Sequence, residues 1–292
     1  MDSGALNGSR FGMRGTEDIG GGDQIQFALE QGFSSATGMP SNPALAFSRQ
    51  AWVGLASSWG SLRVGLQNSP VYIPLTAALD AFTVNTLASG FDSFMSITPR
   101  QGNAISYHSP DLNGLTGQVM VVLRDRNTAM KNGIGSYHLA LELNKLSFSY
   151  VLGYQHVESA DAKSVLDSLF TGGFYSFGSL RVHIGYNNSK STATFNKEAF
   201  ALSASYQLTP ASRLSVGVAH AHDRSGMGKD ANQVGLMYWY FLSKRTTLYA
   251  SAGYLANSEN ASYTLTGFPG GVPVAHPGAR ARGVQIGIQH KF

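Results

Sequence analysis

The feature that most constrains this chain is an alternation of apolar and small polar residues in many short segments. In residues 180–187 the apolar Leu180, Val182 and Ile184 share one parity, and polar or small residues occupy the other. The same pattern recurs in four further segments: 146–154, 200–207, 214–218 and 284–289. A period of two is typical of a β-strand with two different faces. The sequence therefore predicts an all-β fold.

The composition says which environments the two faces meet. Charged residues make up only 13% of the chain, about half of the roughly 25% usual in soluble domains. The polar parity carries Gly, Ser, Ala, Gln and Arg rather than a Lys/Glu mixture. No apolar run approaches the ~18 residues that a membrane-spanning helix needs. These features predict a transmembrane antiparallel β-barrel, with an apolar face toward lipid and a wet lumen.

Short and long connections alternate between the candidate strands. Tight turns are expected at positions such as 20–23, 57–60 and 209–212, and longer polar stretches lie between them, of which 70–103 is the longest. Outer-membrane barrels have this asymmetry, with short periplasmic turns and long external loops. We therefore expect residues 1–292 to form a single outer-membrane β-barrel domain.

The strand count suggests that one strand is missing. About 15 candidates are recognised: 9–18, 24–32, 48–56, 61–68, 104–109, 115–126, 136–143, 146–157, 167–176, 180–188, 197–208, 213–222, 232–242, 246–256 and 282–292. Bacterial single-chain barrels have an even number of strands, so we expect about 16 in the intact barrel. Segment 9–18 leads into a short turn, which belongs to the periplasmic side, so this strand runs from the outside inward. A strand that runs outward should therefore precede it. We expect that this first strand and a signal peptide are absent from this sequence.

Five segments resemble one protein family. They are 8–22 (GSRFGMRGTEDIGGG), 49–55 (RQAWVGL), 103–110 (NAISYHSP), 242–246 (LSKRT) and 287–292 (GIQHKF). They occur in the order and at the spacing found in Gram-negative general porins, especially the beta-proteobacterial group. This resemblance implies a trimeric diffusion pore of 16 strands in the bacterial outer membrane. Its implied partners are the lipid bilayer, lipopolysaccharide, and small ions and solutes, and loop 33–47 is where the family contacts its neighbour.

The resemblance also implies an electrostatic constriction, in which the long loop 70–103 folds inward and faces basic residues of the barrel wall. On the first strand Phe11 and Met13 take the lipid parity, so Arg10 and Arg14 should point into the lumen. Arg10 matches the wall arginine of the family. The further basic candidates are Arg63, Arg100 and Arg124.

The acidic side of the constriction has only two candidates. Asp80 and Asp92 are the acids of loop 70–103, which otherwise carries apolar residues suited to packing against a wall. One departure from the family lies at Leu66, where an arginine is usual, so the basic cluster is expected to be reduced unless Arg63 or Arg124 compensates. The resemblance implies passive diffusion of small hydrophilic solutes, and the net charge of +4 leans toward a mild preference for anions, although it does not locate charge in the lumen.

Three other functions are weighed against a general pore. A substrate-specific channel would line its path with aromatic residues and ion pairs, whereas the polar parity here is mainly small. A barrel lipid hydrolase would need a nucleophile and a base on one outward face, and no histidine pairs with a serine in this way. A fragment lacking a strand would expose an unpaired edge to lipid and could be inactive.

No catalytic residue, metal site or cofactor is expected. His220 and His222 share a strand face, but no third ligand accompanies them. Cysteine is absent, which excludes disulfides and thiolate metal sites. The basic residues are dispersed along the chain, so nucleic-acid binding is not expected.

Overall fold

The structure, a computed structural model of the chain, describes residues 2–83, 85–124, 133–266 and 271–292. The strands are β1 (Arg10–Gly20), β2 (Asp23–Gly32), β3 (Gln50–Ser57), β4 (Gly60–Asn68), β5 (Arg100–His108), β6 (Leu115–Leu123), β7 (Ile134–Asn144), β8 (Phe148–Glu158), β9 (Val165–Phe177), β10 (Leu180–Ser191), β11 (Phe195–Thr209), β12 (Ser212–Asp223), β13 (Ala231–Phe241), β14 (Thr246–Asn257) and β15 (Arg280–His290). Two short helices, α1 (Tyr72–Ala78) and α2 (Gly90–Phe94), lie between β4 and β5.

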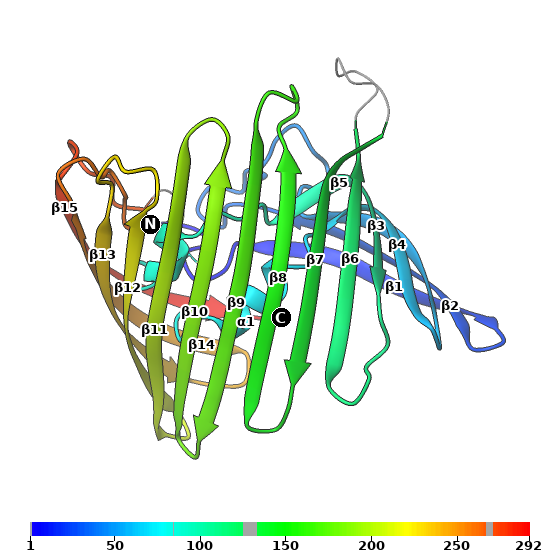
Figure 1. Cartoon of the computed structure of the whole chain (residues 1–292). Helices are drawn as coiled ribbons and strands as arrows, with labels where there is room; N and C mark the ends of the chain where they lie inside the picture. Colours follow the sequence, from blue (N-terminus) through cyan, green and yellow to red (C-terminus); the bar gives the residue numbers. More distant parts are fainter. Residues whose placement is uncertain (1, 84, 125–132, 267–270) are drawn as a thin grey trace.

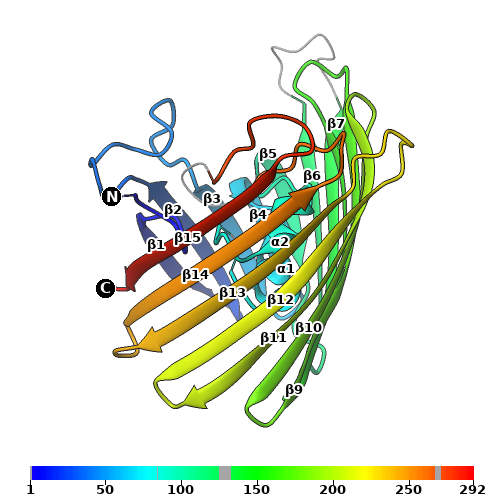
Figure 2. The ribbon, with the colours of Figure 1, turned by 90° about the vertical axis from the view of Figure 1, so that its left-hand side faces the viewer.

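The strands form one antiparallel sheet in which every strand pairs with its neighbour in sequence. The sheet curls around an interior that holds α1 and α2 (Figures 1 and 2). The predicted all-β antiparallel fold is confirmed. Within the described residues β1 pairs with β2 alone and β15 with β14 alone, so these two strands are the sheet edges. The sixteenth strand stays a prediction.

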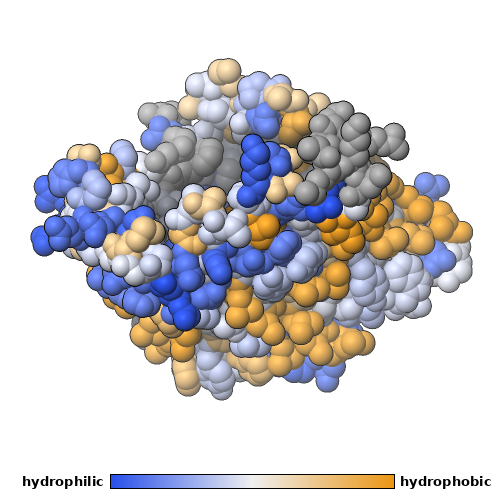
Figure 3. Space-filling model, turned by 45° about the horizontal axis from the view of Figure 1, so that its top comes forward, coloured by the Kyte–Doolittle hydropathy of each residue, from blue (hydrophilic) through white to orange (hydrophobic). Residues whose placement is uncertain are grey.

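The two faces of the sheet differ as the alternation predicts. On β13 the outward Val234, Leu236 and Tyr238 are exposed, whereas the alternate residues Gln233 and Met237 are buried. Hydrophobic residues gather on the outer wall below a more hydrophilic rim (Figure 3). Among the described residues, no helix has the length and apolar character needed to cross a membrane. The apolar outward parity is the face suited to lipid.

The connection between β4 and β5 lies on the concave side of the sheet. In this β4–β5 loop, α1 contacts β8 and β9, while α2 contacts β11, β12 and β13. Its side chains Leu79, Phe91 and Phe94 are buried against the inner wall. A hydrophobic core therefore occupies part of the interior, because the loop places apolar side chains against small wall residues.

A second long connection joins this core. Between β14 and β15, Leu265 is fully buried in the same cluster, and Tyr263 packs edge-to-face on Phe94 with ring centroids 5.1 Å apart. The backbone N–H of Thr266 donates to Ser93 Oγ at 3.1 Å. The polar composition of this connection predicts an external loop, so the inward packing of Leu265 is a departure from that expectation.

Two glycines let the β4–β5 loop approach the wall. A Cβ at Gly235 on β13 would lie 1.9 Å from the carbonyl oxygen of Ala88, and one at Gly253 on β14 would lie 2.0 Å from that of Leu87. Both contacts are with backbone atoms, which cannot rotate away as the end of a side chain can. The inner face must therefore be glycine at these positions for the loop to dock.

We expect Gly235→Val to push the β4–β5 loop away from the wall. The added side chain overpacks the contact, and such changes cost about 1–3 kcal/mol. The expected result is a lower unfolding midpoint by circular dichroism in detergent and faster proteolysis within residues 70–99. Gly117→Val on β6 is the matched control, because its Cβ would meet nothing closer than a leucine methyl at 3.4 Å. Equal midpoints and equal proteolysis for the two variants would contradict this account of the docking.

Candidate functional site: a basic cavity

A cavity of about 720 Å³ lies between the wall formed by β1–β3 and the β4–β5 loop. Four arginines and one glutamate contribute to its lining: Arg10, Arg14, Arg49, Arg100 and Glu30. The loop side contributes mainly neutral residues, among them Tyr72, Ile73, Thr76, Met95 and Ile97. The charge of the cavity is therefore concentrated on one wall.

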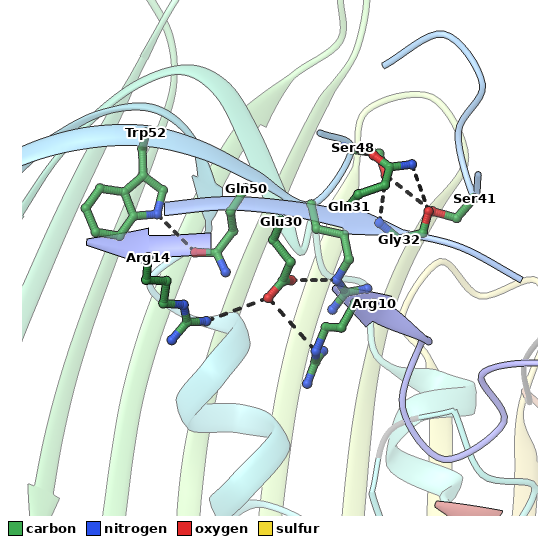
Figure 4. A network of polar contacts seen from close by, with 10 residues as sticks. Arg10, Arg14, Glu30, Gln31, Gly32, Ser41, Ser48, Gln50 and Trp52 are labelled. Atoms are coloured by element: carbon green, nitrogen blue, oxygen red, sulfur yellow. Dashed lines mark hydrogen bonds and ion pairs between the residues drawn. The ribbon is translucent and has the colours of Figure 1, made fainter. Parts of the chain in front are cut away.

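Three of the arginines share one carboxylate. Arg49 Nε donates to Glu30 Oε1 at 2.7 Å, and Glu30 Oε2 lies 3.6 Å from Arg14 Nη2 and 4.0 Å from Arg10 Nε. Figure 4 shows Arg10 and Arg14 reaching Glu30 from the neighbouring strand. Because one negative charge serves three positive ones, the cluster keeps a net positive charge.

The alternation on β1 and β2 explains how this cluster forms. In the antiparallel register Gly12 pairs with Glu30, so Arg10 and Arg14 flank the carboxylate from positions two residues away on either side. All three side chains take the inward parity, while Phe11 and Met13 are exposed on the outward one. The Arg14 side chain is 73% exposed, so its charge faces the open space of the cavity.

Arg49 is the residue that sequence reasoning missed. It precedes β3 directly, and its backbone N–H donates to the carbonyl of Glu30 at 3.1 Å. The expected strand 48–56 includes Arg49, but there it shares the parity of the apolar Val53 and Leu55, so the alternation indicated the outer face rather than Glu30. The available signal was its place in the RQAWVGL segment, beside the end of the strand that carries Glu30.

The two candidate acids have different surroundings. Asp80 accepts hydrogen bonds from Ser89 Oγ at 2.7 Å and from the N–H of Phe82 at 2.8 Å, so its carboxyl is engaged within the loop. Asp92 accepts from the N–H of Asn85 at 3.1 Å and contributes to the cavity lining, which Asp80 does not. Burial raises the pKa of Asp80 to about 7 and that of Asp92 to about 6. The negative charge on the loop side therefore decreases as the pH falls below about 7.

The remaining basic candidates are placed apart from one another. Arg100 at the start of β5 lines the cavity, with its guanidinium carbon 5.9 Å from the Tyr72 ring centroid. Arg63 on β4 stacks on Trp52 at 4.5 Å and does not line the cavity. Arg124, which follows β6, pairs with Glu158 at 2.7 Å and is also outside the lining.

The histidine pair lies on the outward parity of β12. His220 Nδ1 is 2.9 Å from Asn232 Oδ1, and His222 Nδ1 is 3.3 Å from Asp230 Oδ1. In the part of the chain that the structure describes, no three His, Cys, Asp or Glu residues are grouped closely enough to hold a metal ion.

Comparisons with known proteins agree with this architecture. A sequence model described as Gram-negative porin matches residues 1–260. Outer membrane porin protein 32 of Delftia acidovorans is 28% identical, over 97% of this chain and 84% of that protein. An outer membrane porin protein of Bordetella pertussis is 26% identical, over 100% of this chain and 84% of that protein.

A solved structure is also similar. The anion-selective porin from Comamonas acidovorans superimposes with a TM-score of 0.80 at 25% identity, covering 99% of this chain and 90% of that one. The relatives are named as outer membrane porins, so the resemblance and the outer-membrane localisation predicted from the sequence are confirmed. The chain belongs to the family of Gram-negative porins.

Proposed function

We propose that this chain forms a water-filled channel through which small hydrophilic solutes and ions diffuse passively, with a mild preference for anions. The observation that carries the proposal is the charge imbalance of the cavity. Arg10, Arg14, Arg49 and Arg100 face the space with Glu30 as their carboxylate neighbour on the same wall. A narrow wet passage with a positive wall lowers the free energy of a passing anion and raises that of a cation.

The constriction in this proposal is asymmetric. Its basic side is the group Arg10, Arg14, Arg49 and Arg100, and its acidic side, within the described residues, is Asp92. Arg63, Arg124 and Asp80 lie outside the cavity lining, so we give them no part in the narrowest region. The preference is mild because Glu30 offsets part of the positive charge.

The proposed assembly is a homotrimer in the outer membrane, surrounded by lipid and lipopolysaccharide. Support comes from the loop between β2 and β3, where Met39 is 60% and Leu45 is 47% exposed. A contact with a neighbouring subunit at this loop would remove the apolar surface of these two side chains from water. The same loop is the one that the family uses to contact its neighbour.

We expect Arg14→Gln to reduce the anion preference. The substitution removes a positive charge that faces the cavity, and the exposure of Arg14 means that folding should tolerate it. The measurement is the reversal potential of single channels under a KCl gradient, from which the anion-to-cation permeability ratio should fall about twofold at moderate salt. Arg245→Gln in the turn between β13 and β14 is the matched control. A ratio unchanged by Arg14→Gln would overturn the assignment of the basic wall.

The anion preference should also fall as the pH rises from about 5 to about 8. Carboxyl groups with raised pKa values, about 6 for Asp92 and about 7 for Asp80, lose protons in this range and add negative charge to the loop side. Asp92→Asn keeps the carbonyl acceptor for Asn85 but cannot ionise. Its reversal potential should therefore change less with pH than that of the unmodified protein, and an identical pH profile would contradict the role of Asp92.

The trimer proposal predicts the effect of charges in the β2–β3 loop. Met39→Asp with Leu45→Asp places two carboxylates in the proposed contact, so the trimer band in unheated detergent gels should decrease at least about tenfold. Leu146→Asp, at a fully exposed leucine in the turn between β7 and β8, is the control and should leave the trimer intact. An undiminished trimer in the double variant would place the contact elsewhere.

A further inference from the structure

Two arginines outside the constriction lie near the short-turn end of the sheet. Arg181 is the second residue of β10 and Arg213 the second residue of β12. Strand β11 separates them, with Ser205 paired to Arg181 and Gln207 paired to Arg213. Neighbouring strands are about 4.8 Å apart and each residue advances about 3.4 Å, so the two positions are about 10 Å apart across the sheet and about 7 Å apart along it.

Both side chains take the inward parity. On β10, Arg181 lies on the same face as the buried His183 and on the opposite face from the exposed Ile184. Arg213 likewise shares its parity with the buried Ser215, whereas Val216 is exposed on the outer wall. The two guanidinium groups therefore face the lumen rather than the lipid.

Each guanidinium lies over aromatic rings of the adjoining strand. The Arg181 guanidinium carbon is 4.1 Å from the centroid of Phe174, and that of Arg213 is 4.6 Å from Trp239 and 5.6 Å from Phe241. Stacking of this kind fixes the plane of the guanidinium but leaves its positive charge in place. It also leaves N–H groups at the edge of the group available to an acceptor.

The surroundings contain donors without acceptors. Among the described residues, neither arginine has a carboxylate within ion-pair distance, and Arg181 Nε donates to Ser176 Oγ at 3.0 Å. Arg213 Nε and Trp239 Nε1 are buried and have no hydrogen-bond partner in this part of the chain, and the same holds for Ser215 Oγ. Arg213 and Trp239 are direct partners across β12 and β13, and Ser215 is two residues further along β12. Positive charge and unpartnered donors thus occur at one place on the wall.

We propose that Arg181 and Arg213, beside the buried Trp239 and Ser215, form a second anion site, which takes small dianionic oxyanions such as phosphate or a short dicarboxylate. None of these four residues lines the constriction cavity, so the site is separate from the Arg10–Arg14 cluster. This inference rests on the proposed function, because an anion that passes the constriction would meet this site near the short-turn mouth. Charge-assisted hydrogen bonds from guanidinium groups are the strongest that such an anion can accept here.

Trp239 supplies a direct readout of occupancy. The chain has three tryptophans, so Trp52→Phe with Trp59→Phe leaves Trp239 as the sole emitter. The purified protein in detergent is titrated with sodium phosphate and, separately, with sodium succinate, at an ionic strength held constant with chloride. We expect a saturable change in Trp239 emission. In the same background Arg213→Gln should weaken the apparent affinity about tenfold or more, and Arg245→Gln should leave it unchanged.

The two probes distinguish the sources of the oxyanion. Saturation by phosphate alone assigns the site to inorganic or ester phosphate, saturation by succinate alone assigns it to dicarboxylates, and saturation by both supports the shared chemistry. No saturable change with either probe would overturn the site, and so would equal affinities for Arg213→Gln and its parent. Arg181→Gln is the second variant if Arg213→Gln does not fold, as judged by its heat-dependent mobility in detergent gels.

Bilayer recordings of the same preparations separate this site from the proposed function. Conducting channels without a phosphate-dependent change in emission would overturn the second site and leave the pore standing. A saturable emission change in a protein that forms no channels would overturn the pore function, while the anion site itself would stand.

Discussion

The structure depends on one constraint, which is that a strand in lipid must satisfy its backbone hydrogen bonds within the sheet. Once the backbone is fixed in this way, only the side-chain parity is left to distinguish lipid from lumen. The outward parity is apolar, as at Val234 and Leu236, and the inward parity has to leave room for the β4–β5 loop. At Gly235 and Gly253 that room is taken up by loop carbonyls, so the glycine content and the inward fold have the same physical cause.

The net charge of the cavity reflects a balance between repulsion among its guanidinium groups and their neutralisation by a carboxylate. Three guanidinium groups at the constriction would repel one another strongly without a counter-charge, and full neutralisation would remove the field that favours an anion. Glu30 lies between these limits, since it contacts Arg10, Arg14 and Arg49 from one carboxylate. The opposite side carries few charged residues, and burial of Asp80 and Asp92 raises the pKa of each. The field across the passage therefore comes mainly from one wall.

How far the sequence predicts this site depends on whether a residue lies in a strand. Parity placed Arg10 and Arg14 on the inner face, because alternation in a strand determines direction. Arg49 falls on the apolar parity of the expected strand 48–56, whereas in the structure it lies just before β3 and contacts Glu30, which is 19 residues away. The hydrogen bond from Ser89 to Asp80 depends on how the loop folds on itself, and the burial of Leu265 depends on two loops meeting inside the barrel. Such contacts are set by tertiary packing, which local pattern does not encode.

The arginines away from the constriction show how this chain holds positive charge without many excess basic residues. It has 21 Lys and Arg against 17 Asp and Glu, so pairing every cation with an acid would leave little charge over. On the inner wall Arg63, Arg181 and Arg213 instead lie over Trp52, Phe174 and Trp239. An aromatic face orients a guanidinium group and leaves its charge in place, whereas an ion pair orients the group and neutralises its charge. Aromatic stacking thus keeps these side chains against the wall and out of the passage, and lets a modest net charge act along the lumen.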